Sequence, residues 1–232
     1  MVFLEITLAA ILSLLHYFSE KFSNKIEKFH DELISFSAGL FITQIFVFLM
    51  PEFFEGKNFI GDNIFILLII GFVSFHISEK FIYQHIKDKN KLMKDLAEVH
   101  AIGFFVDHFV VGIAIVFAFQ STNILLGLVI YFALVLHTLS SSISLTHIDT
   151  YFKQNQMVNI LLSIAPLLGV IFAGLLNPDR TLYYVTFSLV LGALLYVSIR
   201  DMLPYRKEGK LAFFVTGFFI SLIVAQLVNF FG

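Results

Sequence analysis

Hydrophobic residues along this chain fall into long runs that short polar segments interrupt. The runs do not alternate with polar residues as the strands of a membrane barrel do, so they predict helices. A bilayer core about 30 Å thick is crossed by about 20 apolar helical residues, so each run is long enough to span it. We predict eight membrane-spanning helices: residues 2–18, 33–51, 63–83, 98–119, 124–147, 157–176, 182–200 and 211–231.

Composition agrees with a membrane protein. Of the 232 residues, 58 % are hydrophobic and 14 % are charged, and the mean hydropathy is +0.88, outside the usage of soluble domains. The expected fold class is all-α, a polytopic membrane helix bundle that forms a single transmembrane domain over residues 1–232. We expect a multi-pass protein of the cell membrane, which in a prokaryote is the cytoplasmic membrane. The net charge of −2 gives no basic field for nucleic acid, so the lipid bilayer is the expected partner.

Lysine and arginine residues gather at one end of the predicted helices. Thirteen of the fifteen lie at or beyond the ends of the first, third, fifth and seventh spans, whereas Lys57 and Arg180 lie on the other side. Cationic loops face the cytoplasm, so both termini are predicted outside and the Lys-rich loop, residues 84–97, inside. The first eighteen residues lack a basic start and a small-residue cleavage site, so we expect a retained span rather than a signal peptide.

Three polar side chains are expected at one depth of the membrane. Asp107 lies about ten residues, or roughly 15 Å at 1.5 Å per residue, from the cytoplasmic end of the fourth span. His137 lies equally deep in the fifth span, and Gln44 reaches a similar depth in the second. The connection between spans four and five is short, so we expect antiparallel neighbours in which Asp107 or His108 meets His137.

Further polar residues lead away from this level. Glu98 and His100 are expected near the cytoplasmic mouth of a path along the fourth span. Ionisable groups inside a membrane normally face a partner or a water-filled cavity, which indicates transport or binding. Interhelical hydrogen bonds or a structural ion pair are the alternative. A polar face of the fifth span comprises His137, Ser140, Ser141 and Ser144. Histidines near span ends, with expected interfacial roles, are His16, His30, His85 and His147.

Three stretches resemble segments of the ZIP (Zrt/Irt-like) family of divalent-metal transporters. Ser35–Glu52, SFSAGLFITQIFVFLMPE, is similar to the family's second span, and Val73–Ile82, VSFHISEKFI, resembles the end of its third. Asp107–Ile115, DHFVVGIAI, is similar to its H-N-x-x-D-G-x-x-I segment. The resemblance implies eight spans with outside termini, alternating access, and a divalent metal as substrate rather than prosthetic group. A homodimer is consistent with it.

The sequence departs from the family at the metal ligands. Asp107 stands where the family has its first His, His108 where it has Asn or Ser, and Val111 where it has Asp. In the fifth span, Thr138 and Ser141 replace the two glutamates of H-E-x-P-x-E. Because the chain has no Cys, the ligands must be imidazole, carboxylate or neutral oxygen. The resemblance implies one reduced metal site with the candidate ligands Asp107, His108, His137, Gln44 and Ser141.

The leading interpretation is a transporter that moves a divalent transition metal toward the cytoplasm, zinc first, with iron or manganese as alternatives. The alternative is a non-transporting relative whose eroded site serves a sensor or partner-binding protein. We do not expect an enzyme, because a zinc hydrolase needs a carboxylate base beside the metal and no G-x-S-x-G elbow is present. The glutamates that could serve as such a base lie near span ends, away from the middle of the membrane: Glu20, Glu52, Glu55, Glu79 and Glu98.

Overall fold

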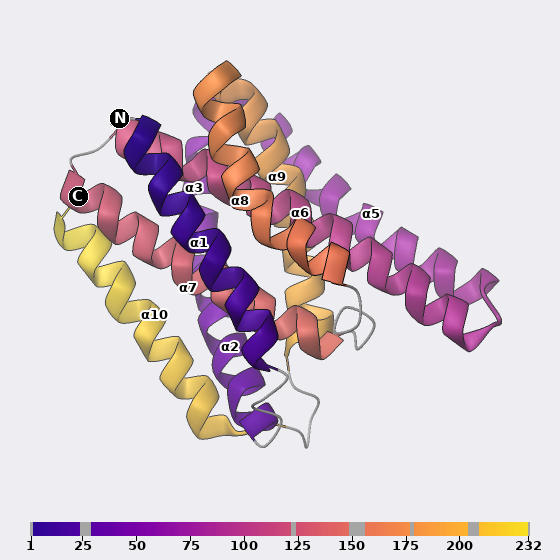
Figure 1. Cartoon of the computed structure of the whole chain (residues 1–232). Coiled ribbons are helices and arrows are strands. Elements are labelled where there is room, and N and C mark those ends of the chain that lie inside the picture. The colour runs from indigo at the N-terminus through magenta and orange to yellow at the C-terminus, as the bar shows by residue number, and fades with distance from the viewer. Residues whose placement is uncertain are drawn as a thin grey trace.

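The computed structural model describes residues 2–23, 29–121, 124–148, 156–176, 179–203 and 209–231, and the regular elements within them are all helical. Figure 1 shows the helices running side by side in a bundle. This confirms the all-α class. The elements are α1 (Val2–Ser23), α2 (His30–Gln44), η2 (Ile45–Leu49), α3 (Met50–Glu55), α4 (Lys57–Ile60), α5 (Asn63–His85), α6 (Lys89–Ser121), α7 (Ile124–Ile148), α8 (Gln156–Leu176), α9 (Arg180–Val197), η4 (Ser198–Met202) and α10 (Leu211–Phe231).

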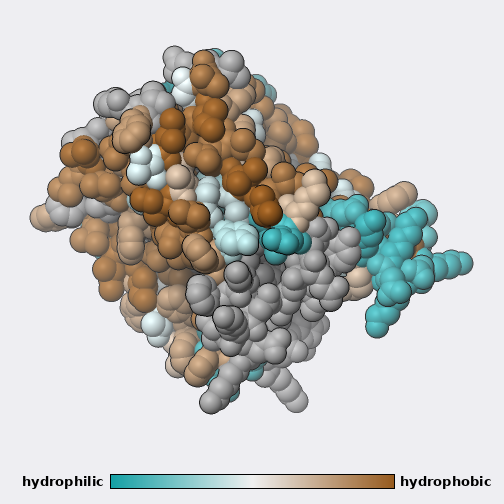
Figure 2. Space-filling view, in the orientation of Figure 1, coloured by the Kyte–Doolittle hydropathy of each residue, from teal (hydrophilic) through white to brown (hydrophobic). Residues whose placement is uncertain are grey.

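Several helices are able to cross a membrane. Much of the face seen in Figure 2 is hydrophobic, as expected for side chains that contact lipid. Five helical segments of the described residues are long and apolar enough: Asp31–Ile60, Asn63–His85, Lys89–Phe119, Gln156–Leu175 and Arg180–Arg200. Three shorter apolar stretches overlap the other predicted spans: Phe3–Ser19, Ile130–Leu139 and Leu211–Leu227.

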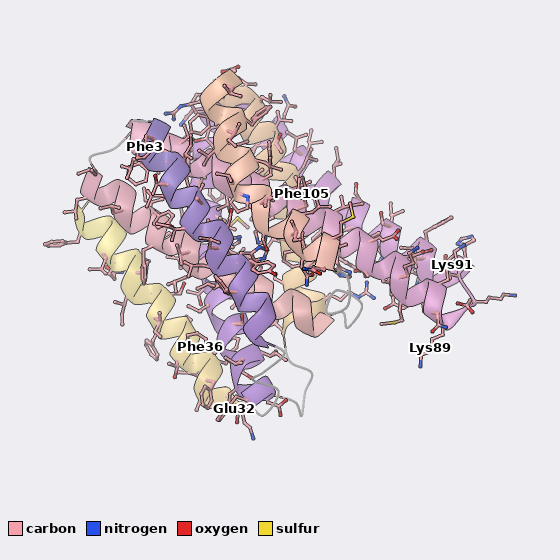
Figure 3. The ribbon with its side chains drawn as sticks, viewed as in Figure 1. Phe3, Glu32, Phe36, Lys89, Lys91 and Phe105 are labelled. Carbon is pink, nitrogen blue, oxygen red and sulfur yellow. The ribbon has the colours of Figure 1, made fainter. Side chains whose placement is uncertain are left out.

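The Lys-rich segment differs from its prediction as a loop over residues 84–97. Helix α5 continues to His85 and α6 already begins at Lys89, so a short link joins a helical hairpin. The Asp88 carboxylate explains the early start, because it accepts a hydrogen bond of 2.8 Å from the backbone N–H of Lys91 and caps the helix. Lys89 and Lys91 point away from the bundle at the tip of this hairpin (Figure 3).

Three helix pairs approach so closely that their backbones touch. In each pair, a Cβ atom added to a glycine of either helix would lie 2.0–2.2 Å from a carbonyl oxygen of the other. Small residues allow this approach, and van der Waals packing drives helix association where the hydrophobic effect does not. The pairs are α2 with α10 through Gly39 and Gly217, α5 with α9 through Gly71 and Gly192, and α6 with α8 through Gly112 and Gly169.

Further contacts between helices join these three pairs, together with α1 and α7, into one bundle. Helices α1 and α6 both pack on α7 and α8, whereas α2 and α10 both pack on α7. Helix α6 also contacts α5 and α9, so it joins the α6–α8 unit to the α5–α9 unit. The contacts of α6 with α7 and α9 therefore position the polar residues in the middle of the fourth predicted span.

The glycine contacts generate a prediction for stability. Replacing Gly112 or Gly169 by Ala should destabilise the fold by about 1–3 kcal/mol, because the new methyl group meets rigid backbone. Chemical unfolding in detergent micelles would measure the loss. The matched control is Gly127→Ala, whose Cβ would meet the Phe119 ring, which can rotate, rather than a carbonyl. Equal losses in all three variants would contradict the assignment of the α6 and α8 contact.

Candidate functional site

Asp107 of α6 and His137 of α7 meet in the interior. His137 Nε2 lies 3.0 Å from Asp107 Oδ2 and 3.3 Å from Oδ1. The two residues are 4 % and 2 % exposed, and the imidazole stacks on the Phe41 ring. This is the contact expected for antiparallel fourth and fifth spans. With Nε2 directed at the carboxylate, His137 Nδ1 has no hydrogen-bond partner within the part of the chain that the structure describes.

Gln44 reaches the same level from α2. Its Nε2 donates to the Ala133 carbonyl of α7 over 3.1 Å, while its Oε1 has no hydrogen-bond partner among the described residues. The π-helical turn η2 follows immediately, and such turns occur frequently at functional sites. The amide is thereby fixed with its oxygen as an available acceptor.

His108 does not share the orientation of Asp107. Its side chain is fully buried, its ring centroid lies 4.5 Å from that of His16 on α1, and its Nε2 lies 3.8 Å from Asp107 Oδ2. Successive helical residues point about 100° apart, so His108 faces α1 when Asp107 faces α7. His16 was expected at the membrane interface; the structure instead buries it completely. Ser141 lies outside the residues whose side chains are described.

A cavity of about 670 Å³ connects the Asp107–His137 pair with the molecular surface. Its outer end is lined by exposed residues, among them Glu55, Asn58 and Arg180, and its inner end by the buried Gln44, Asp107 and His137. The wall between the two ends is mostly apolar, with Ala114, Phe117, Phe187 and Leu191 among its residues. His108 is not among the lining residues. The cavity therefore has polar groups at its mouth and at its floor.

The mouth carries carboxylates. Glu52 accepts a hydrogen bond of 3.0 Å from the Tyr184 hydroxyl, and Glu55 accepts one of 3.3 Å from Asn58 Nδ2. Arg180 lies over the Phe59 and Phe117 rings, with its guanidinium carbon 5.9 and 5.5 Å from their centroids. The entrance thus has two carboxylates and one guanidinium, an excess of acidic groups that favours cations. The apolar wall of the cavity has a low dielectric constant, which strengthens the electric field of these charges.

The floor of the cavity offers a carboxylate, an imidazole and an amide. Imidazole and carboxylate together suit zinc, iron and manganese. Within the described residues, however, no group of three or more His, Asp or Glu side chains is arranged to hold a metal ion. Asp107, His137 and Gln44 therefore form a partial ligand set, which water molecules would have to complete.

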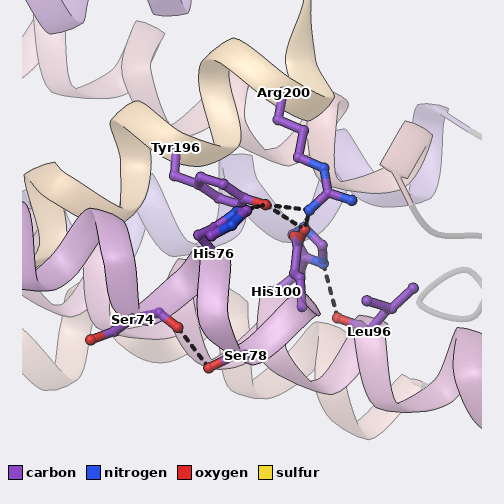
Figure 4. Close-up of polar contacts among 8 residues, drawn as sticks. Ser74, His76, Ser78, Leu96, His100, Tyr196 and Arg200 are labelled. Atoms are coloured by element: carbon purple, nitrogen blue, oxygen red, sulfur yellow. Dashed lines mark hydrogen bonds and ion pairs between the residues drawn. The ribbon is translucent and has the colours of Figure 1, made fainter. Parts of the chain in front are cut away.

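A second polar cluster, here called the Glu79 network, joins α5, α6 and α9 (Figure 4). Glu79 is 1 % exposed; its Oε1 lies 3.2 Å from His100 Nε2, and its Oε2 accepts a hydrogen bond of 2.9 Å from the Tyr196 hydroxyl. Arg200 contacts both Glu79 and Tyr196. His76 completes the network, with Nδ1 3.4 Å from the Tyr196 hydroxyl.

The partner of His100 differs from the expectation that His100 and Glu98 lie together at the cytoplasmic mouth of a path. His100 pairs with Glu79 rather than with Glu98, which is exposed and lies 3.7 Å from Lys94. The sequence places Glu79 near the end of a span, and its burial depends on packing by α9. The sequence contained a signal for the Glu79–Arg200 contact. Glu79 lies near the end of the third predicted span and Arg200 at the end of the seventh, and both spans end on the same side of the membrane.

Comparison with known proteins identifies no family, since no protein-family model and no curated protein matches this chain. The resemblance to ZIP transporters therefore rests on three stretches of its sequence.

The cavity predicts that its wall can be reached by water-soluble reagents from one side of the membrane only. Because the chain has no Cys, a single thiol can be introduced into the wall at Ala114 and treated with a membrane-impermeant thiol reagent. Ala114→Cys should react from the side on which Glu55 lies and not from the other. Ala165→Cys, on the buried face of α8 and outside the cavity, is the control and should not react. Equal labelling from both sides would rule out a cavity closed at the Asp107 level.

Proposed function

We propose that the chain is a membrane transporter that moves a divalent transition-metal cation, zinc foremost, toward the cytoplasm by alternating access. The observation that carries this proposal is the cavity, which leads from the carboxylates of the mouth to the buried Asp107–His137 pair. A cation drawn to Glu52 and Glu55 reaches an anionic group halfway through the bundle. Such an arrangement suits a carrier, because it exposes a buried site from one side.

The proposed topology has eight spans with both termini outside. It is supported by the five long apolar helices and by the three shorter apolar stretches that overlap the remaining predicted spans. The lysines at the tip of the α5–α6 hairpin favour a cytoplasmic position for that end. The cavity mouth then faces outside, so the direction of transport is inward.

Each ligand has a proposed role. Asp107 supplies the negative charge, His137 a nitrogen and Gln44 an amide oxygen, because these three residues line the floor of the cavity. His108 lies behind the floor and adds to the electrostatic environment of Asp107. A single carboxylate leaves a divalent ion with net positive charge in a low dielectric, so binding is weak. Weak binding favours release, which transport requires.

Alternating access is supported by the helix pairs. The glycine contacts hold α5 against α9 and α6 against α8 as closely packed units. The Asp107 site lies on α6, and the opposite wall of the cavity includes Phe187, Leu191 and Leu194 of α9. Sliding of the α6–α8 unit along the α5–α9 unit exposes the site to the other side without breaking a glycine contact.

A second candidate is a non-transporting membrane protein in which the pair is structural. It is favoured by the absence, within the described residues, of three ionisable ligands arranged for a metal, and by the fact that Asp107 and His137 already satisfy one another. Such a protein binds no transition metal, and its function does not depend on the charge of Asp107.

Uptake of Zn, Mn, Fe and Cd into proteoliposomes would separate the two candidates. Asp107→Asn keeps an acceptor for His137 Nε2 but removes the charge, and His137→Ala removes the imidazole. Each change should reduce uptake by about tenfold or more, since a loss of 1.4 kcal/mol in binding weakens a site tenfold.

The control for uptake is His85→Ala, because His85 is exposed and remote from the cavity lining. It should transport like the unchanged chain. Absence of uptake for every ion by folded protein, or full uptake by Asp107→Asn, would contradict the transporter and favour the structural pair.

A further inference from the structure

The cavity is larger than a metal ion requires. Its volume is about 670 Å³, whereas about six water molecules around a divalent ion occupy about 180 Å³, at about 30 Å³ for each water in the liquid. Binding sites for small organic molecules have volumes of about 300–1,000 Å³. The cavity therefore has room for an organic molecule that contacts Asp107 and the wall together.

Most of the wall is apolar or aromatic. Phe48 lines it from η2, Val111 and Phe117 line it from α6, and Phe187 and Leu191 line it from α9. The water molecules around a metal ion gain no hydrogen bonds from such a surface, whereas an apolar ligand releases the water that covers it. Sites for organic ligands commonly combine a wall of this kind with a few polar groups that fix the orientation of the ligand. The cavity has this composition, because its polar groups lie at the floor and at the mouth.

The floor of the cavity suits a ligand with a single positive charge. His137 Nε2 lies 3.0 Å from Asp107 Oδ2, and a neutral imidazole with its hydrogen on Nε2 is sufficient for this contact. The pair then has the single negative charge of the carboxylate. A monovalent cation neutralises that charge, whereas a divalent ion leaves a net positive charge in a medium of low dielectric constant.

The hydrogen-bonding capacity of the floor suits an ammonium group. A carboxylate has about four acceptor positions, so Asp107 can accept from an ammonium while it keeps His137 as a donor. Gln44 adds an acceptor at the same level, because its Oε1 has no hydrogen-bond partner among the described residues. A primary ammonium has three N–H donors and no acceptor. Its donors are therefore complementary to the oxygens of Asp107 and Gln44.

The mouth shows that aromatic rings of this cavity already contact an organic cation. The guanidinium carbon of Arg180 lies 5.5 Å from the centroid of Phe117 and 5.9 Å from that of Phe59, and both rings belong to the lining. Aromatic faces attract cations through the ring quadrupole, and the attraction is stronger where water is excluded. The buried rings of Tyr183 and Phe187 also line the cavity. An organic cation therefore meets aromatic rings along the wall.

We propose that the cavity binds an organic ammonium ion, a primary amine with an apolar body, with its ammonium group at Asp107 and Gln44 and its body against the aromatic wall. This binding requires the cavity and its charge but no transport, so it goes beyond the metal carrier proposed above. A metal ion and the ammonium group exclude one another, because both need the carboxylate of Asp107. The amine competes with the metal in a carrier and is itself the ligand in a protein that transports no metal.

Fluorescence can report this binding directly, because the chain contains no Trp. Phe187→Trp places a single indole in the wall, and energy transfer from this indole to dansylcadaverine is measured in detergent micelles. This probe combines a primary ammonium with a naphthalene body. Its N-acetyl derivative has the same body without the charge and controls for partition into the micelle. Transfer to dansylcadaverine should saturate, and the acetylated probe should bind at least about tenfold more weakly.

Two variants of the Phe187→Trp protein test the floor and the wall separately. Asp107→Asn removes the charge and should weaken binding of dansylcadaverine by about tenfold or more, without weakening that of the acetylated probe. Ala114→Phe fills part of the cavity but keeps the charge, and it should weaken the binding of both probes. The matched control is Asp31→Asn, because Asp31 is exposed and outside the cavity lining, and it should leave both affinities unchanged.

Three results would overturn the ammonium site. They are transfer that never saturates, equal affinity for the two probes, and undiminished binding of dansylcadaverine by folded Asp107→Asn protein. If Asp107→Asn does not fold, the comparison of the two probes and the effect of Ala114→Phe decide.

Competition with Zn²⁺ separates this site from the proposed transport. Displacement of bound dansylcadaverine by Zn²⁺ would support a shared site at Asp107. Saturable amine binding that Zn²⁺ does not displace, together with no uptake of any ion, would reject the metal carrier and support the ammonium site. Uptake of zinc by protein that binds no amine would reject the ammonium site and leave the carrier intact.

Discussion

Burial of a carboxylate in an apolar bundle is the constraint on which this structure depends. Asp107 is 4 % exposed, and a carboxylate removed from water is costly unless another group pairs with it. His137 supplies that partner from a neighbouring helix, so the pair fixes the relative height of α6 and α7. The same contact leaves the carboxylate at the floor of the cavity that opens at the molecular surface.

The helix contacts differ in how closely the two backbones approach. Where two glycines face one another, the backbones touch and the helices have little freedom to shift. The wall between α6 and α9 contains larger side chains, such as Phe104, Leu191 and Leu194, which form a smoother apolar surface. Asp107 lies on the α6–α8 unit, and the facing wall of the α5–α9 unit is apolar. Sliding of one unit along the other at this wall therefore breaks few hydrogen bonds.

Asp107 and Glu79 are buried carboxylates that lie on opposite sides of an apolar layer. Asp107 faces the cavity, and Glu79 lies beyond the apolar layer formed by Leu194 and its neighbours. Each is paired with a histidine from a different helix, at 3.0 Å for His137 and 3.2 Å for His100. Among the described residues, the bundle thus places an ionisable pair on each side of this apolar layer, and the Asp107–His137 pair lines the cavity that opens at the mouth.

The sequence by itself determined the helical class, most of the helix positions and the common depth of Asp107, His137 and Gln44. Depth follows from counting residues along a helix, which is a local property. Only the tertiary structure decided that His108 faces His16 and that the partner of His100 is Glu79, because the direction of a side chain depends on how each helix is rotated by its neighbours. That rotation is set by packing between segments far apart in the chain, which no local pattern records.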